Sequence, residues 1–264
     1  MYKLGIHHLT AIETDPVTFV AIAAETGCQE VSVFTRQPGA RSNYPLVNSD
    51  NRGAMAATLA ETGVRIANIE SFMLTPVTDP SAFEPALELG ARLGARSAGV
   101  QVFDDQEARV VDNLSALSEL ASGLGLAVAI EFMPLAPAWK TLAATVELVA
   151  KVSHPGLAIG IDLLHLVRSG GSPEDVSAMA PGLIGYAQLC DGADLRVTSD
   201  YAGEAASKRL APGEGVFPLA SFLRALPEGT PIELEVPQPP IRPPLARVQQ
   251  AVAAARRLIE AAHH

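Results

Sequence analysis

The feature that most constrains the fold of this chain is a regular alternation of short apolar segments with longer amphipathic ones. The short segments are rich in Val, Ile and Ala, and their β-branched residues are typical of strands. They lie near residues 3–8, 29–35, 64–70, 97–103, 126–132, 157–162, 183–189 and 231–236. The stretches between them repeat apolar residues three and four positions apart, as at Val110, Leu114 and Leu117, which predicts helices.

Strand–helix pairs that follow one another without a break in composition predict parallel strands joined by crossover helices. A single α/β domain over residues 1–264, closed as a (β/α)8 TIM barrel, fits the number of pairs and the length of 264 residues. An open doubly wound sheet is the alternative, but no glycine-rich dinucleotide-binding fingerprint follows the first strand. The connection after the seventh strand, residues 190–217, is long and is a candidate lid.

Composition narrows the class of partner. The chain has 29 acidic and 19 basic residues and a net charge of −10, which argues against binding to a nucleic acid backbone. No apolar stretch approaches the length of a membrane span. Two cysteines are too few for a disulfide framework, which favours a cytoplasmic protein with reduced thiols. We therefore expect a small-molecule partner, and a homodimer is compatible with this expectation because barrels of this kind often pair.

Two of the predicted strands end in an acid that shares a face with small residues. Ala129 lies two positions before Glu131, and Gly160 lies two positions before Asp162. Side chains alternate between the two faces of a strand, and small residues fit the interior of a barrel. Both acids are therefore predicted to point inward at the C-terminal mouth, where barrel enzymes keep their chemistry.

Four oxygen-bearing side chains stand at the ends of four consecutive predicted strands: Glu131, Asp162, Gln188 and Glu235. Carboxylates that meet at a barrel mouth repel one another, and a bound divalent cation reverses this repulsion. Carboxylate and amide oxygens are hard ligands, so Mg²⁺ or Mn²⁺ is predicted rather than zinc. The alternative is that the acids pair with Arg or Lys at the rim, which fits one acid better than four neighbouring ligands.

Several motifs in the second half of the chain carry a resemblance to a known family. They are IEFMP, GIDLLHLVRSG, YAQLCDG, RLAPGEGVFPL and IELEVP. Together they resemble the xylose isomerase-like TIM-barrel superfamily, which includes sugar phosphate isomerases, ketose 3-epimerases, dehydroshikimate dehydratases and an AP endonuclease branch. The resemblance covers essentially the whole chain, with specific motifs from residue 128 onward.

The resemblance implies roles for individual residues. Residues at the positions of Glu131, Asp162, Gln188 and Glu235 hold one divalent metal ion in that family, and the residue at the position of His165 contacts the substrate. The resemblance also implies that the two glutamates can serve as acid and base. The chain departs from many epimerases at the seventh strand, where they have histidine and this chain has Gln188. Dehydroshikimate dehydratases and some uncharacterised members assigned as epimerases have glutamine there as well.

The four predicted metal ligands and His165 together predict a metal-dependent isomerase or epimerase. Its substrate would be a keto sugar, a sugar phosphate or a keto sugar acid, and the reaction would pass through an enediolate. Glu131 and Glu235 come from strands three apart in a ring of eight, so they can flank a substrate and act as two bases. His165 is predicted to exchange a proton with a substrate hydroxyl. The alternative is a lyase that uses the same groups to dehydrate a cyclic hydroxy ketone such as 3-dehydroshikimate.

Three arginines and one further glutamate complete the candidate site. Arg209 lies in the long loop, and Arg168 and Arg36 follow strands on the same end of the predicted barrel. Arginine binds carboxylate or phosphate in a bidentate manner, so all three are candidates for substrate binding. Glu233 shares a strand face with Glu235, and either could be the metal ligand. Glu235 is the preferred choice because it lies nearer to the strand end.

Two other classes of function rank lower. A metal phosphodiesterase acting on abasic DNA needs a basic groove and additional histidine ligands, whereas this chain has six histidines and a net charge of −10. A barrel that binds a sugar without catalysis is disfavoured because Glu131, Asp162, His165 and Glu235 are all present.

Overall fold

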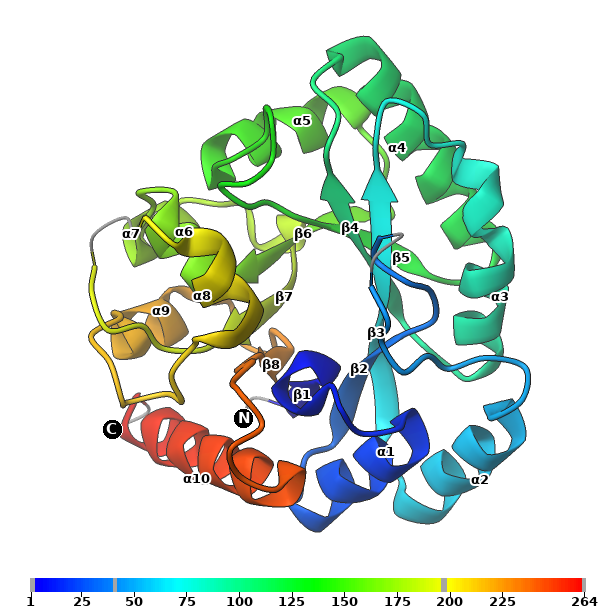
Figure 1. The fold of residues 1–264 in the computed structure, drawn as a ribbon. Helices are drawn as coiled ribbons and strands as arrows, with labels where there is room; N and C mark the ends of the chain where they lie inside the picture. Colours follow the sequence, from blue (N-terminus) through cyan, green and yellow to red (C-terminus); the bar gives the residue numbers. More distant parts are fainter. Residues whose placement is uncertain (1–2, 40–41, 196–198, 263–264) are drawn as a thin grey trace.

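The computed structural model describes residues 3–39, 42–195 and 199–262, and they form a closed barrel of parallel strands in sequence order (Figure 1). The strands are β1 (Leu4–His7), β2 (Glu30–Phe34), β3 (Arg65–Leu74), β4 (Ser97–Val102), β5 (Ala127–Glu131), β6 (Leu157–Asp162), β7 (Ile184–Leu189) and β8 (Ile232–Leu234). β1 pairs with both β2 and β8, which closes the ring. The predicted single-domain TIM barrel is confirmed.

Helices surround the barrel in Figure 1. They are α1 (Pro16–Glu25), α2 (Arg52–Thr62), α3 (Glu84–Arg92), α4 (Glu107–Gly123), α5 (Leu142–Val152), α6 (Leu163–Arg168), α7 (Pro173–Ser177), α8 (Tyr201–Ser207), α9 (Leu219–Ala225) and α10 (Pro244–Ala262), with 3₁₀ turns η1 (His8–Ala11), η2 (Pro80–Phe83) and η3 (Pro181–Leu183). Local sequence sets their starts, as at α1, where the Asp15 side chain accepts from the backbone N–H of Val17 and Thr18. Within the described ranges, no helix is both long and apolar enough to cross a membrane.

Two strands differ in length from the prediction. β3 continues four residues beyond the predicted 64–70, because its upper part pairs with β4 as far as the Leu74–Val102 pair. β8 is shorter than the predicted 231–236 and ends at Leu234. Its ladder stops because the N–H of Val236 donates to the Thr10 hydroxyl at 3.0 Å instead of to a neighbouring strand.

Glycines of β4 and β6 face the barrel interior, as the strand pattern predicted for Gly160. A Cβ atom at Gly160 would lie 2.5 Å from the ring of Tyr186, and one at Gly99 would lie 2.9 Å from Glu70 Oε1. Contacts this short are incompatible with a side chain. Glycine at these two positions therefore leaves room for a buried tyrosine and a buried carboxylate inside the barrel.

The segment after β7 is held in place by one buried carboxylate. Asp191 accepts from the backbone N–H groups of Gly192 (2.9 Å), Gly213 (2.9 Å), Gly215 (3.0 Å) and Phe217 (2.9 Å). Residues 196–198 of the candidate lid 190–217 lie outside the described residues. The hydrogen bonds of Asp191 tie the start of this segment to its end.

Replacing Asp191 with Asn is expected to lower the free energy of unfolding by about 2 kcal/mol, because a buried carboxylate that accepts several N–H groups loses its charge and one of its acceptor atoms. Urea denaturation measures the loss. The exposed Asp112 serves as a matched control, and Asp112→Asn is expected to leave stability unchanged. Equal stability of the two variants would contradict the anchoring role of Asp191.

Candidate active site

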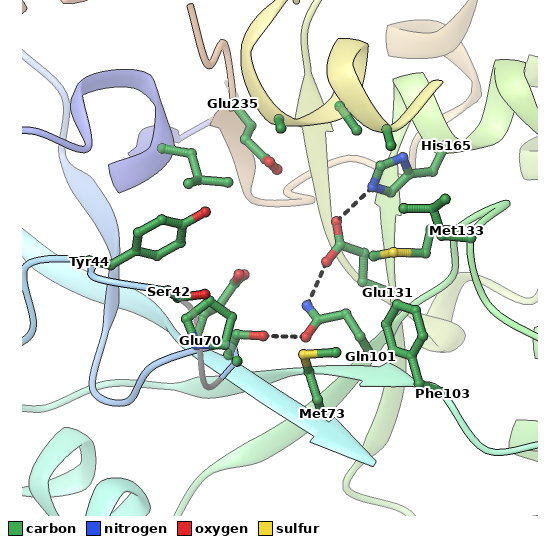
Figure 2. Close-up of a pocket in the computed structure, with 18 of the residues that line it drawn as sticks. Ser42, Tyr44, Glu70, Met73, Gln101, Phe103, Glu131, Met133, His165 and Glu235 are labelled. Carbon is green, nitrogen blue, oxygen red and sulfur yellow. Dashed lines mark hydrogen bonds and ion pairs between the residues drawn. The ribbon is translucent and has the colours of Figure 1, made fainter. Parts of the chain in front are cut away.

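A cavity of 690 Å³ lies at the C-terminal mouth of the barrel (Figure 2). Its polar wall includes Glu70, Gln101, Glu131, His165, Arg209 and Glu235. Its less polar wall includes Phe34, Tyr44, Met73, Phe103, Met133 and Leu135. Polar groups that converge within a partly apolar cavity are typical of a small-molecule site.

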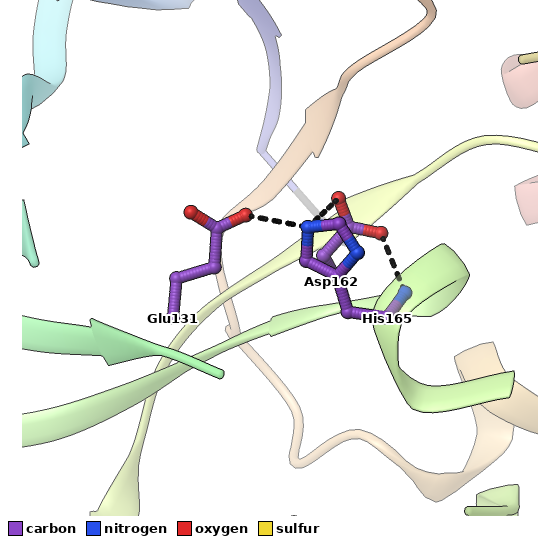
Figure 3. Close-up of side chains that lie close together, drawn as sticks. All are labelled: Glu131, Asp162 and His165. Carbon is purple, nitrogen blue, oxygen red and sulfur yellow. Dashed lines mark hydrogen bonds and ion pairs between the residues drawn. The ribbon is translucent and has the colours of Figure 1, made fainter. Parts of the chain in front are cut away.

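Glu131, Asp162 and His165 lie together at the ends of β5 and β6 (Figure 3). His165 Nε2 lies 3.3 Å from Glu131 Oε1 and 3.8 Å from Asp162 Oδ2. On the other side of the ring, His165 Nδ1 and the hydroxyl of Tyr201 share a hydrogen bond of 2.7 Å. Burial lowers the pKa of His165, but the two carboxylates outweigh it and raise the pKa above its usual value.

Asp162 is fixed by the helix that follows it. Its Oδ1 accepts from the N–H of Leu164 at 2.6 Å and from the N–H of His165 at 3.4 Å, so it caps α6. Its Oδ2 accepts from Nη1 of Arg209. Burial raises the pKa of Asp162, but Arg209 and His165 outweigh burial and hold the pKa below its usual value.

Arg209 is 2% exposed and lies between two acids. Its Nη1 donates to Asp162, and its Nη2 lies 2.9 Å from Glu235 Oε1. Burial raises the pKa of Glu235 above its usual value, although Arg209 and His7 oppose the shift. Arg209 thus lines the cavity, and its guanidinium contacts two carboxyl groups of the chain itself.

The structure separates Glu235 from Glu233. Glu235 lines the cavity at the mouth, whereas Glu233 lines a smaller cavity of 140 Å³ toward the other end of the barrel. Glu233 accepts a hydrogen bond from the Ser32 hydroxyl, and its Oε2 lies 3.5 Å from Nε2 of Gln188. This geometry favours Glu235 as the ligand at the mouth. Gln188 is buried beside Glu233, and its Oε1 has no hydrogen-bond partner among the described residues.

Glu233 is expected to make stability depend on pH. Burial raises its pKa from 4.5 to about 7, so the folded chain binds this proton more tightly than the unfolded chain does. The contribution of Glu233 is therefore lost as the pH rises from 4.5 to about 7. The Glu233→Gln variant lacks this dependence. Its free energy of unfolding, compared with that of wild type at the same pH, is expected to rise by roughly 3 kcal/mol between pH 4.5 and about 7. Urea denaturation at several pH values measures the free energy of unfolding of both proteins. A parallel fall in wild type and Glu233→Gln would contradict the role of Glu233. Glu228→Gln, which changes an exposed glutamate, is the control and should follow wild type.

Two of the predicted substrate-binding arginines do not line the cavity at the mouth. Arg168 donates to both carboxylate oxygens of Glu204 at 2.7 and 2.6 Å and to the carbonyl oxygen of Asp194 at 2.8 Å. These bonds attach α6 to α8. Arg36 stacks on Phe83 and lines a different cavity.

Gln101, Glu70 and Tyr201 line the cavity and were not among the sequence-predicted site residues. Gln101 Nε2 donates to Glu131 Oε2 at 2.7 Å, so Gln101 positions the Glu131 carboxylate (Figure 2). Glu70 Oε2 lies 3.1 Å from His7 Nε2. Both polar residues lie near the ends of predicted strands, so the signal used for Glu131 could have identified them. Tyr201 lies on α8 and carried no such signal.

The buried donors fit a divalent cation. Glu131, Asp162 and His165 each offer a ligand atom, and these atoms lie within 4.8 Å of one another. Two further buried oxygens, Glu235 Oε2 and Gln188 Oε1, have no hydrogen-bond partner among the described residues. An unpartnered buried oxygen is costly unless a cation or a donor satisfies it. The site can therefore hold one divalent metal ion.

Comparison with known proteins gives one family match. The family model described as xylose isomerase-like TIM barrel matches residues 20–261. No curated protein sequence matches the chain.

Solved structures share the fold over nearly the whole chain. The IOLI protein with a bound zinc atom is 16% identical, with a TM-score of 0.81 and coverage of 98% of both chains. An L-ribulose 3-epimerase is 15% identical, with a TM-score of 0.77 and coverage of 100% of this chain and 96% of the epimerase. A probable 3-DHS dehydratase from Bacillus anthracis is 16% identical, with a TM-score of 0.75 and coverage of 96% of this chain and 98% of the dehydratase.

Proposed function

Because the chain belongs to the xylose isomerase-like TIM-barrel family, we propose that it is a metal-dependent isomerase or epimerase of a keto sugar, a sugar phosphate or a keto sugar acid. The observation that carries this proposal is the buried Glu131–His165 pair, at 3.3 Å, in a cavity that Glu235 also enters. The fold shared with an L-ribulose 3-epimerase supports the same class of reaction.

The proposed metal ligands are Glu131, Asp162, Gln188 and Glu235, and Mg²⁺ or Mn²⁺ suits their oxygen atoms. The triad that includes His165 is the alternative set, and the shared fold of the zinc-bound IOLI protein supports a bound metal without fixing its identity. When bound, the cation polarises the carbonyl of the substrate and makes the adjacent C–H more acidic.

The two glutamates suit opposite steps of proton transfer. Burial raises the pKa of Glu131, but hydrogen bonds from His165 and Gln101 help to outweigh burial and lower it, so Glu131 is ionised and can accept a proton at Oε1. Glu235 has a raised pKa and can hold a proton for return to the substrate. His165, oriented by Tyr201, exchanges a proton with a substrate hydroxyl in this proposal.

The second candidate is dehydration of a cyclic hydroxy ketone such as 3-dehydroshikimate. Gln188 at the seventh strand and the fold shared with a probable 3-DHS dehydratase favour it. The same base would remove the C–H proton, and an acid would protonate the departing hydroxyl.

Proton exchange followed by NMR tests both functions. The protein is loaded with Mn²⁺ or Mg²⁺ and incubated in D₂O with neutral ketoses, ketose phosphates, keto sugar acids and 3-dehydroshikimate, and the metal-chelated protein is the control. Deuterium that enters a C–H without loss of water supports the isomerase or epimerase. A new alkene or aromatic signal supports the dehydratase. Absence of both changes with every substrate would refute the proposal.

A further inference from the structure

A second cavity, of 530 Å³, lies beside α3 and the loop that leads into α2. Its polar lining consists of Thr35, Arg36, Asn48, Ser49, Arg52, Glu88 and Arg92. None of its lining residues belongs to the cavity at the barrel mouth. Three arginines and a single glutamate line it, in a chain whose net charge is −10. This local excess of positive charge is opposite in sign to the charge of the whole protein.

Arg36 holds a fixed and uncompensated charge in this cavity. Its guanidinium lies 4.3 Å from the ring centroid of Phe83 and 5.9 Å from that of Phe72, and its Nη1 donates to the carbonyl oxygen of Ser71 at 3.3 Å. No carboxylate of the described residues pairs with it, and burial alone lowers its pKa. Stacking orients the guanidinium before any ligand arrives, so little entropy is lost when it binds an anion.

Two further groups of the same cavity lack partners among the described residues. Arg52, at the start of α2, forms no ion pair or side-chain hydrogen bond there. Thr35 is 8% exposed, and its Oγ1 has no hydrogen-bond partner. The lining carboxylate, Glu88, lies 3.2 Å from Arg92 and is committed to that arginine. Two cations therefore remain available, and the buried Thr35 hydroxyl beside them is unpartnered within the described residues.

We propose that this cavity binds a phosphate group, either as free phosphate or as the phosphate of a small monoester. A phosphate group presents several oxygens in the geometry that a guanidinium fork matches. It would supply the counter-charge that Arg36 and Arg52 lack. The proposal does not depend on the reaction at the barrel mouth.

Isothermal titration at constant ionic strength tests the proposal with inorganic phosphate, glycerol 3-phosphate and uncharged glycerol as probes. We expect saturable one-site binding of the phosphate compounds and none of glycerol. The compound that binds with the lower Kd shows whether the site prefers free phosphate or a phosphate monoester. Arg36→Gln and Arg52→Gln are each expected to weaken binding at least about tenfold, because each loses a charge-assisted contact.

Matched variants locate the site. Arg257→Gln changes an exposed arginine on α10 and is expected to bind phosphate as wild type does. Glu131→Gln alters the cavity at the barrel mouth and is also expected to leave phosphate binding unchanged. Because Arg52 is exposed, its variant should keep the fold even if the Arg36 variant does not. Absence of saturable binding, or wild-type affinity in Arg52→Gln, would overturn the proposal.

Discussion

Replacing Glu131 with Gln is expected to lower the rate of substrate proton exchange by about three orders of magnitude. The amide cannot accept a proton at the position of Oε1, which lies 3.3 Å from His165 Nε2. It also removes one charge from the proposed metal site, so the affinity for Mn²⁺ should fall. Deuterium incorporation by NMR measures the rate, and titration calorimetry measures the affinity.

The control for this variant is Glu174→Gln, which changes an exposed glutamate on α7 and should leave both quantities unchanged. Asp162→Asn provides a second comparison, because Asp162 is a proposed ligand but not a proposed base. It should weaken metal binding in the same way. If both Glu131→Gln and Asp162→Asn bound metal as wild type does, the proposed metal site would be wrong.

Replacing Arg209 with Met is expected to lower the free energy of unfolding of the metal-free protein by about 3–5 kcal/mol. The variant leaves Asp162 and Glu235 buried without the cation that now lies between them. Stability is lost because buried negative charge is left without a counter-charge. A cation that binds the same carboxylates should therefore restore part of the free energy of unfolding. Urea denaturation with and without Mn²⁺ measures both effects.

Arg257→Met is the matched control, because Arg257 is exposed on α10 and its loss should change stability little with or without metal. Mn²⁺ should stabilise Arg209→Met more than it stabilises wild type. An equal gain in the two proteins would show that Arg209 and the metal do not share these carboxylates.

The barrel and the core of the site were predictable because both depend on local patterns. Strand periodicity placed Glu131 and Asp162 on the inner face, and the parallel order of strands brought them to one end of the barrel. The single-domain TIM barrel needed only the repeated strand–helix pattern. Neither the barrel nor the inward direction of these two acids depends on the partner that an individual side chain contacts.

The positions of the three arginine side chains depend on tertiary partners that the sequence pattern does not identify. Arg168 pairs with Glu204, which is 36 residues away along the chain, and Arg36 stacks on an aromatic ring of η2. Arg209 reaches the cavity, but it is held there by two acids. Spacing along the chain places a residue at one end of the barrel, whereas long side chains extend from there in directions that tertiary packing decides.

The contacts of Asp191 order the backbone next to Arg209 during folding, before any ligand binds. Asp191 and Leu210 exchange backbone hydrogen bonds of 2.8 and 2.9 Å, and the carboxylate of Asp191 binds the turn that follows. The conformational entropy of this part of the loop is therefore lost during folding. A ligand that enters the cavity meets Arg209 on a backbone that is already ordered, so ordering this wall subtracts nothing from the ligand's binding free energy.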